Sequence, residues 1–251
     1  MLSLCPPFAL LVALSLGIRA DEMPHVPAPP HPPVFADRAE AGERLGTAVR
    51  EAIGKIQIHH GERPVVFAVP RGGVAVAAGV ARCLAAPLEL IVVRKIGHPD
   101  APEFGLGAIA EGGEPVFDDA VLAEAGLDVA DLTEVVRRER AELARRVGIY
   151  RRGLDDAARL AGVAIVVDDG LATGVTARAA LRAVARRFAG IRTVLAVPVA
   201  SQGSLESINA EADEVVTVVT ARRLRSVGEW YVDFGQLTDA DVLTLIAEGQ
   251  P

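Results

Sequence analysis

The chain has 251 residues, of which 51% are hydrophobic, and its formal net charge is −7. A chain of this length can bury a full core, and one α/β domain is the natural count. The acidic balance excludes a nucleic-acid-binding surface, which would need a basic field. Cys5 and Cys83 offer neither a disulfide framework nor metal-ligand spacing, so we expect a protein of the reducing cytoplasm.

Residues 1–33 differ from the rest of the chain, because they hold 8 of its 16 prolines. The apolar run from Phe8 to Ile18 is too short to span a bilayer as a helix. It could form the core of a signal peptide, with Ala20 for cleavage, although no Lys or Arg precedes it. The alternatives are a disordered tail and a non-native extension ahead of a true start at Val34. We therefore expect the folded domain to cover residues 34–251, without a membrane span.

The first predicted elements of the domain are a helix and a strand. Asp37 to Ile58 carries apolar residues at helical spacing, and Val65 to Val69 is an apolar strand. The strand is followed at once by Pro70-Arg71-Gly72-Gly73 and a helix that runs to Leu84. A strand, a Gly-Gly turn and a helix can cradle an anion, and Arg71 adds a charged donor. The alternative role of the glycines is close packing of the helix on the sheet.

The next predicted strand, Leu88 to Val93, ends in Arg94-Lys95. Two cations at the carboxyl end of a buried strand would face the crevice in which open α/β sheets bind ligands. Packing explains such a pair poorly. Ile96 to Gly107 follows, with the length and the glycines and prolines of a mobile loop.

Further helices and strands alternate along the second half of the chain. Asp131 to Arg152 is a long helix whose arginines alternate with acids, which favours a solvated, salt-bridged face. Arg192 to Val197 and Glu214 to Val219 are predicted strands, each after a helical segment, and Thr238 is a good N-cap for a last helix. Strands that alternate with helices predict a doubly wound, mostly parallel sheet with helices on both faces.

The stretch from Val163 to Thr176 carries the strongest signal for a site. An apolar, β-branched run predicts a buried strand, two acids close it, and a turn rich in Gly and Thr leads into a helix. Backbone N–H groups at the start of that helix form a nest for a phosphate, and the carboxylates suit neighbouring hydroxyls such as a ribose cis-diol. The alternative is an Asp-Gly turn that merely caps a helix. The expected binding residues are Asp168, Asp169, Gly170, Ala172, Thr173, Gly174, Val175 and Thr176.

The order Asp-Asp-Gly-Leu-Ala-Thr-Gly-Val-Thr closely resembles the 5-phosphoribosyl 1-pyrophosphate (PRPP) motif of type I phosphoribosyltransferases. The resemblance implies a small hood beside the sheet and a loop, at Ile96–Gly107, that closes over the active site. It also implies that the turn after Val69 binds pyrophosphate, often through a non-proline cis peptide, and that Arg94-Lys95 act on the same group. On this basis the catalytic candidates are Arg71, Arg94 and Lys95, and the further PRPP-binding candidates are Gly72 and Gly73.

The stretch from Val227 to Phe234 resembles a C-terminal segment of hypoxanthine–guanine phosphoribosyltransferases. In that family the acid helps to hold magnesium and nearby residues stack on the base. The resemblance makes Asp233 a metal candidate, together with Asp168 and Asp169. It makes Trp230 and Tyr231 candidates for base stacking, and an aromatic cluster that covers the sheet end is an equal alternative.

Residues 35–247 as a whole resemble a bacterial group of predicted phosphoribosyltransferases, whose name states no acceptor. The implied reaction is Mg²⁺-dependent transfer of phosphoribose from PRPP to a nitrogen acceptor, nucleobase-like, with release of pyrophosphate. The rival is a non-catalytic regulatory protein that binds PRPP or a nucleotide, and hydrolysis or pyrophosphorolysis is a third hypothesis. The expected partners are PRPP and an unidentified small-molecule acceptor, with no nucleic acid and no membrane. A second copy of the chain could also be a partner, in a homodimer.

We expect a chain that starts at Val34 to keep the melting temperature of the full-length protein to within a few degrees. The reason is that residues 1–33 lack the pattern of an element that packs on a core. Thermal unfolding of both forms, followed by circular dichroism, measures this. A loss of more than a few degrees in the shorter chain would contradict the expectation.

Overall fold

The computed structural model describes residues 31–55, 63–102, 104–151 and 161–249. The chain divides into two units, residues 1–32 and residues 33–251, and only the second is described below. All helices and strands of the described residues lie in the second unit. The expectations for residues 1–30, for the end of the first helix at Ile58 and for Arg152 fall outside the described residues.

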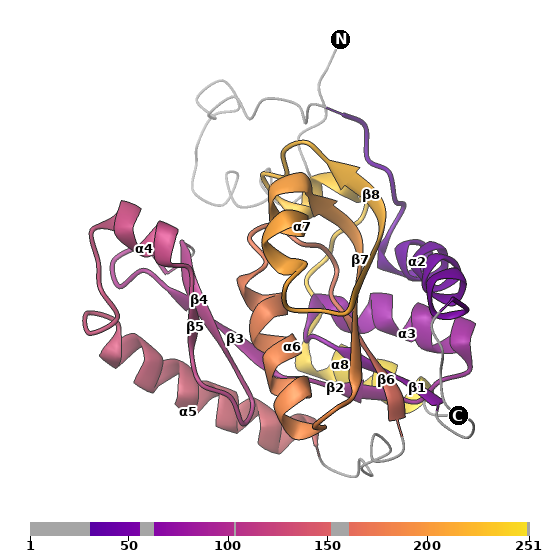
Figure 1. Cartoon of the computed structure of the whole chain (residues 1–251), viewed down its shortest axis with the longest axis horizontal. Coiled ribbons are helices and arrows are strands. Elements are labelled where there is room, and N and C mark those ends of the chain that lie inside the picture. Colours follow the sequence, from indigo (N-terminus) through magenta and orange to yellow (C-terminus); the bar gives the residue numbers. More distant parts are fainter. Residues whose placement is uncertain (1–30, 56–62, 103, 152–160, 250–251) are drawn as a thin grey trace, which may run out of the picture. The chain divides into compact units, whose positions relative to one another are not determined.

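A five-stranded parallel sheet forms the centre of the second unit, in the order β2-β1-β6-β7-β8 (Figure 1). All four pairs of neighbours run parallel. The predicted doubly wound parallel sheet is therefore confirmed. Its strands are β1 (Arg63–Ala68), β2 (Leu88–Leu90), β6 (Ala161–Val167), β7 (Arg192–Ser201) and β8 (Glu214–Ala221).

Helices cover both faces of this sheet. α2 (Arg38–Ile53) and α3 (Gly72–Leu84) lie on one face, and α6 (Val175–Arg187) lies on the other (Figure 1). In β1, Val66 and Ala68 join the core on the α3 side, whereas Val65 and Phe67 join the core on the α6 side. Side chains of a strand alternate between the two faces, so a strand that is covered on both sides needs a continuous apolar run.

A second, antiparallel sheet of three strands forms the hood, in the order β3-β4-β5. Its strands are β3 (Val93–Gly97), β4 (Gly105–Ala110) and β5 (Val116–Phe117). The next helices in the chain are α4 (Asp119–Ala125) and α5 (Thr133–Tyr150), and α5 packs against β3 and β4.

The strand predicted over Leu88–Val93 is wrong, because the structure has two strands there. β2 ends at Leu90, and β3 begins at Val93 in the other sheet. Arg94 and Lys95 therefore lie inside a hairpin strand and do not follow the carboxyl end of a central strand. A continuous apolar run gives no sign of where the chain leaves one sheet for another.

The loop predicted over Ile96–Gly107 is shorter than expected. Ile96 pairs with Gly107 in the hairpin of β3 and β4, so both ends of the predicted loop are strand. Gly107 is used for close packing, since a Cβ there would lie 2.7 Å from the carbonyl oxygen of Val116 in β5. Glycine therefore marks a tight strand pairing at this position, where it was expected to mark a flexible loop.

The C-terminal part of the unit returns to the central sheet. It comprises α7 (Gln202–Ile208), β8, the short 3-10 helix η2 (Val227–Trp230) and α8 (Asp239–Glu248). Thr238 caps α8 as predicted, because its side chain accepts from the N–H of Asp241 while the Asp241 side chain accepts from the N–H of Thr238. Within the described ranges, no helix is both long enough and apolar enough to cross a membrane.

Glycines let α2 and α3 pack unusually closely. A Cβ at Gly42 of α2 would lie 2.5 Å from the carbonyl oxygen of Val76, and one at Gly79 of α3 would lie 2.7 Å from the carbonyl carbon of Gly42. Real Cβ atoms do not approach backbone this closely, so the two helices would have to separate if either position carried a side chain.

We expect Gly79→Ala to lower the free energy of unfolding by about 1–3 kcal/mol, because the added methyl group overpacks the helix crossing. Gly148→Ala, in α5, is the matched control, since nothing lies within 4 Å of a Cβ there. Alanine is the better helix former, so the control should gain about 0.5–1 kcal/mol. Chemical denaturation of both variants measures the difference, and equal effects would contradict this account of the α2–α3 contact.

Candidate active site

Two turns that the sequence predicts to bind phosphate groups meet at one edge of the central sheet. β1 and β6 are parallel neighbours, so their carboxyl ends lie together, and the strand order runs outward from them in both directions. Open α/β sheets bind ligands at such a point. The peptide between Pro70 and Arg71 is cis, as the family resemblance implies. A Cβ at Gly72 would lie 1.9 Å from Oδ2 of Asp169, so only glycine allows the turns to come this close.

The turn after β6 is held in place by β7 and α7. The N–H of Leu171 donates to the carbonyl oxygen of Val199 (2.8 Å), and the Ser204 hydroxyl donates to the carbonyl oxygen of Ala172. Gly174 adopts a φ of 79°, and α6 begins at the next residue. The first N–H groups of a helix have no partner inside it, so this turn presents several fixed donors to an anion.

Asp168 and Asp169 follow β6 directly and lie close to one another. Oδ1 of Asp168 accepts from the N–H of Asp169 (2.9 Å). Burial, and then the charge of Asp169, raises the pKa of Asp168 to about 8, while Lys95 and Arg38 oppose the shift. Burial also raises the pKa of Asp169 against the opposing effect of Arg38. The pair is therefore short of positive charge, and a cation or hydrogen-bond donors would stabilise its ionised form.

Arg38, in the first turn of α2, is a site residue that the sequence analysis missed. Its Nε donates to Oδ2 of Asp169 (3.0 Å), and its Nη1 donates to the carbonyl oxygen of Gly235 (2.8 Å). The guanidinium group lies 3.7 Å from the centroid of the Phe234 ring, and the Tyr231 hydroxyl donates to the carbonyl oxygen of Asp169 (2.6 Å). An arginine at the start of a helix shows no pattern that points to a partner 131 positions away.

The hood contributes cations to the same site. They come from the interior of β3 and from α5, whereas the prediction placed them at the end of a central strand. Nε and Nη2 of Arg94 both donate to Oε2 of Glu139 (3.0 and 2.7 Å), so a buried carboxylate of α5 holds this arginine. The Lys95 side chain is exposed and faces the cavity. Arg138 and Arg146 of α5 also line it. Each is paired with an acid of the same helix, Glu139 and Glu142 respectively, as expected of a salt-bridged face, and this face of α5 borders the cavity as well.

A cavity of about 460 Å³ joins these groups. Gly73 and Val175 are buried and lie outside its lining. The predicted site residues that line it are Arg71, Gly72, Arg94, Lys95, Asp168, Asp169, Gly170, Ala172, Thr173, Gly174 and Thr176.

A profile of the phosphoribosyl transferase domain matches residues 36–235. The chain belongs to this family. Two proteins of Mycobacterium tuberculosis named "Putative phosphoribosyl transferase", MT0597 and Rv0571c, are each 40% identical over 213 residues, which are 85% of this chain and 46% of the relative. The chain thus spans less than half the length of these curated relatives. The crystal structure of TT1426 from Thermus thermophilus is 40% identical, covers 86% of this chain and 99% of its own, and superposes with a TM-score of 0.67.

The C-terminal candidates of the phosphoribosyl transferase domain do not reach the cavity lining. Trp230 and Tyr231 are 7% and 4% exposed and pack with Phe35 in a separate core, so the aromatic-cluster alternative describes their positions. Asp233 is exposed, and its Oδ1 accepts from the N–H of Gly235 (3.0 Å), so the structure does not bring it together with the acid pair after β6. Val227 is the residue of this stretch that lines the cavity.

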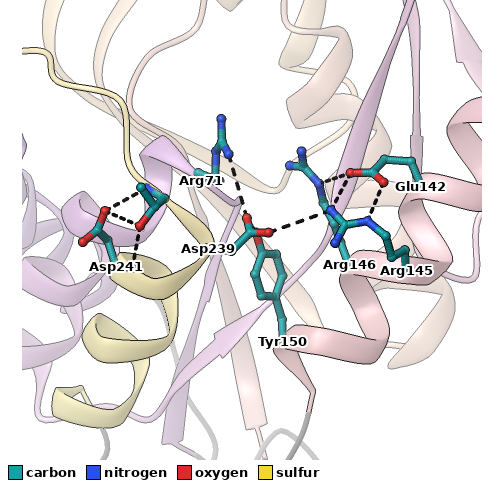
Figure 2. A network of polar contacts seen from close by, with 8 residues as sticks. Arg71, Glu142, Arg145, Arg146, Tyr150, Asp239 and Asp241 are labelled. Atoms are coloured by element: carbon teal, nitrogen blue, oxygen red, sulfur yellow. Dashed lines mark hydrogen bonds and ion pairs between the residues drawn. The ribbon is translucent and has the colours of Figure 1, made fainter.

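A polar network ties Arg71 of the phosphoribosyl transferase domain to two helices (Figure 2). Oδ1 of Asp239, at the start of α8, accepts from the Tyr150 hydroxyl (2.6 Å) and lies 3.8 Å from Nη1 of Arg71. Nη2 of Arg145 in α5 lies 3.8 Å from Oδ2 of the same carboxylate. Burial, and then the hydrogen bond to Asp239, raises the pKa of Tyr150 to about 12, so its hydroxyl remains a donor at neutral pH.

The acid pair offers the donor set for a magnesium ion. Among the described residues no group of three His, Cys, Asp or Glu side chains is placed to hold a metal by itself. Mg²⁺ does not require one, because it keeps several waters and commonly binds one or two carboxylates together with phosphates of a substrate. Asp168 and Asp169 provide hard oxygen atoms beside a phosphate nest, and the residues present fit that mode.

We expect Asp168→Asn to raise the free energy of unfolding at neutral pH by about 1–3 kcal/mol, because it removes one of two partly buried acids whose charges repel each other. Asp169→Asn should gain less or lose stability, since it also removes the ion pair with Arg38 at 3.0 Å. Chemical denaturation without Mg²⁺ compares the two variants. An Asp168→Asn protein less stable than Asp169→Asn would show that the acids are structural.

Proposed function

We propose that this domain binds PRPP with Mg²⁺ and transfers its phosphoribosyl group to a nitrogen acceptor of nucleobase-like character, with release of pyrophosphate. The observation that carries the proposal is the meeting of two anion-binding turns around one pair of carboxylates in a cavity of about 460 Å³. PRPP has a phosphate on one side of its ribose, pyrophosphate on the other and two hydroxyls between them. The order of phosphate, ribose hydroxyls and pyrophosphate along PRPP therefore matches the order of the turn before α6, the acid pair and the turn after β1.

Each part of PRPP has a counterpart in the described residues. The nest from Ala172 to Thr176 would take the 5-phosphate, because it offers backbone donors and the positive end of α6. Asp168 and Asp169 would accept hydrogen bonds from the ribose hydroxyls. The turn from Pro70 to Gly73 would take the pyrophosphate, with Arg71 and Lys95 as charged donors.

Mg²⁺ would be held by Asp168 and Asp169, whose buried charges are only partly compensated by Arg38 and Lys95. When bound, the ion would neutralise part of the negative charge on the departing pyrophosphate. Asp233 lies outside the cavity lining, so we do not assign it to this site.

The reaction breaks the bond between C1 and the pyrophosphate oxygen and forms a bond between C1 and the acceptor nitrogen. The bonding electrons leave with pyrophosphate, and the acceptor nitrogen loses its proton to water. Because positive charge grows on the ribose and negative charge on the leaving group, catalysis is mostly positioning and electrostatics, and no side chain needs to be a nucleophile. Arg71 and Lys95 would stabilise the leaving group. Arg94, paired with Glu139, would hold β3 in place against α5.

The rival function is a regulatory protein that binds PRPP or a nucleotide without turnover. A regulatory protein that binds a nucleotide needs the nest and the acid pair, but it has no need for cations at the leaving group. Arg71 and Lys95 both line the cavity, and this observation supports an enzyme. The measurement that separates the two functions is product formation at PRPP concentrations that saturate binding.

We expect calorimetry to show PRPP binding that depends on Mg²⁺, and Asp169→Asn to weaken it roughly ten- to a hundred-fold, the loss of one charge-assisted hydrogen bond. Thr173→Val should weaken it less, because the backbone donors of the nest remain. Glu206→Gln in α7, an exposed acid outside the cavity, is the control and should bind as the unmodified protein does.

Turnover is measured separately, by mass spectrometry of the protein incubated with PRPP, Mg²⁺ and pooled nitrogen acceptors. New phosphoribosyl compounds together with released pyrophosphate would establish the transferase. Tight PRPP binding without any product would favour the regulatory protein. Absence of PRPP binding, or an unchanged affinity in Asp169→Asn, would overturn the proposed function.

A further inference from the structure

The proposed function leaves one part of the cavity lining without a role. PRPP would occupy the two turns and the acid pair, whereas α5 contributes Arg138, Glu139 and Arg146 to the same lining. We call these three residues the α5 wall, and we propose that its two arginines, Arg138 and Arg146, bind an anionic group of the acceptor, either a carboxylate or a phosphate. The inference rests on the proposed function and narrows its second substrate to a nitrogen nucleophile that carries a negative charge.

Arg146 is the best-positioned residue of the α5 wall. Its side chain is 15% exposed, and its Nε donates to Oε1 of Glu142 (2.8 Å), which fixes its direction. Hydrogen bonds from Arg145 and Arg146 lower the pKa of Glu142 to about 2, so that carboxylate stays ionised at neutral pH. Figure 2 shows the terminal nitrogens of Arg146 on the same side of Asp239 as the guanidinium group of Arg71. Among the described residues, no side chain or carbonyl group is hydrogen-bonded to those terminal nitrogens.

The charges of the wall leave an excess of positive charge. Glu139 is shared, because Oε2 accepts from Arg94 and Oε1 accepts from Arg138 at 3.3 Å. Glu142 is likewise shared between Arg145 and Arg146. Asp239 lies near Arg145 as well, but it is shared with Arg71. Arginines therefore outnumber the carboxylates that face them, and an anion in the cavity would supply the missing negative charge. A guanidinium fork matches the two oxygens of a carboxylate or a phosphate.

A neutral nucleobase fits this wall poorly. No aromatic side chain is present among the described residues that line the cavity, so a flat ring would find no aromatic face to stack on. It would also cover the terminal nitrogens of Arg146 without offering them an anion, and desolvation of donors that lack an acceptor is costly. The same wall would hold an acceptor with a carboxylate or phosphate group in a fixed orientation.

Binding of matched ligand pairs tests the inference. The protein is first saturated with ribose 5-phosphate and magnesium pyrophosphate, which fill the sites proposed for PRPP. Calorimetry then compares orotate with uracil, which lacks the carboxylate, and phenyl phosphate with phenol, which lacks the phosphate. We expect the anionic member of at least one pair to bind at least tenfold more tightly. The pair that shows the preference tells which anion the wall recognises.

Arg146→Gln should abolish this preference, lowering affinity for the anionic probe at least tenfold and for the neutral probe less than twofold. Arg146→Lys, which keeps the charge but loses the fork, should fall between. Arg137→Gln is the matched control, because Arg137 lies on the same helix, is 73% exposed and does not line the cavity. If Arg146→Gln lowers the melting temperature, Arg138→Gln serves instead, since that side chain is 59% exposed and we expect its loss to leave the fold intact.

The results separate this inference from the proposed function. Normal binding of PRPP with Mg²⁺, but no preference for either anionic probe, would overturn the inference alone. A preference that survives in both Arg146→Gln and Arg138→Gln would overturn it as well, because the anion would then lie elsewhere. Failure of the unmodified protein to bind PRPP would overturn the proposed function, and the inference with it.

Discussion

The close approach of the β1 turn to the end of β6 is the constraint on which the site depends. A side chain at Gly72 would collide with Asp169, so the backbone of one turn lies directly against the acids of the other. This proximity leaves two neighbouring carboxylates partly buried, and desolvation raises the pKa of both. The fold compensates with cations from distant parts of the chain, Arg38 from α2 and Lys95 from β3. The positions of α2 and the hood are therefore linked to the charge of the site as well as to core packing.

Ion pairs also fix the hood relative to the central sheet. Arg151, after α5, donates to the carbonyl oxygen of Leu90 at the end of β2 (3.2 Å) and pairs with Glu111, after β4. Glu89 of β2 is 2% exposed and lies 3.8 Å from Nη1 of the same arginine. Buried charges are stable only when they are paired, so these contacts hold the junction between the two sheets in one arrangement. The Arg94–Glu139 pair does the same between β3 and α5.

The sequence predicted the elements whose local pattern and surroundings agree. β1 and β6 are apolar runs that end in Gly-containing turns, and this pattern identified the edge at which both turns meet. The change of sheet after Leu90 was missed because the apolar run continues across it. The roles of Arg38 and Arg146 were missed because helical spacing shows which residues share a face, and not what that face meets. Glu139 was likewise indistinguishable from the other acids of α5, although it is buried against Arg94.

In the proposed reaction, the central sheet would bind PRPP and the hood would bind the acceptor. The groups assigned to PRPP lie on turns that follow β1 and β6, where the close contact of Gly72 with Asp169 leaves little freedom for change. The α5 wall belongs to the hood, and its arginines are held by Glu139 and Glu142 of the same helix. Substitutions on this face of α5 can therefore alter the charge offered to an acceptor while the carboxyl ends of β1 and β6 stay as they are. In the proposed arrangement, a donor site on these turns and an acceptor site on the hood would share one cavity.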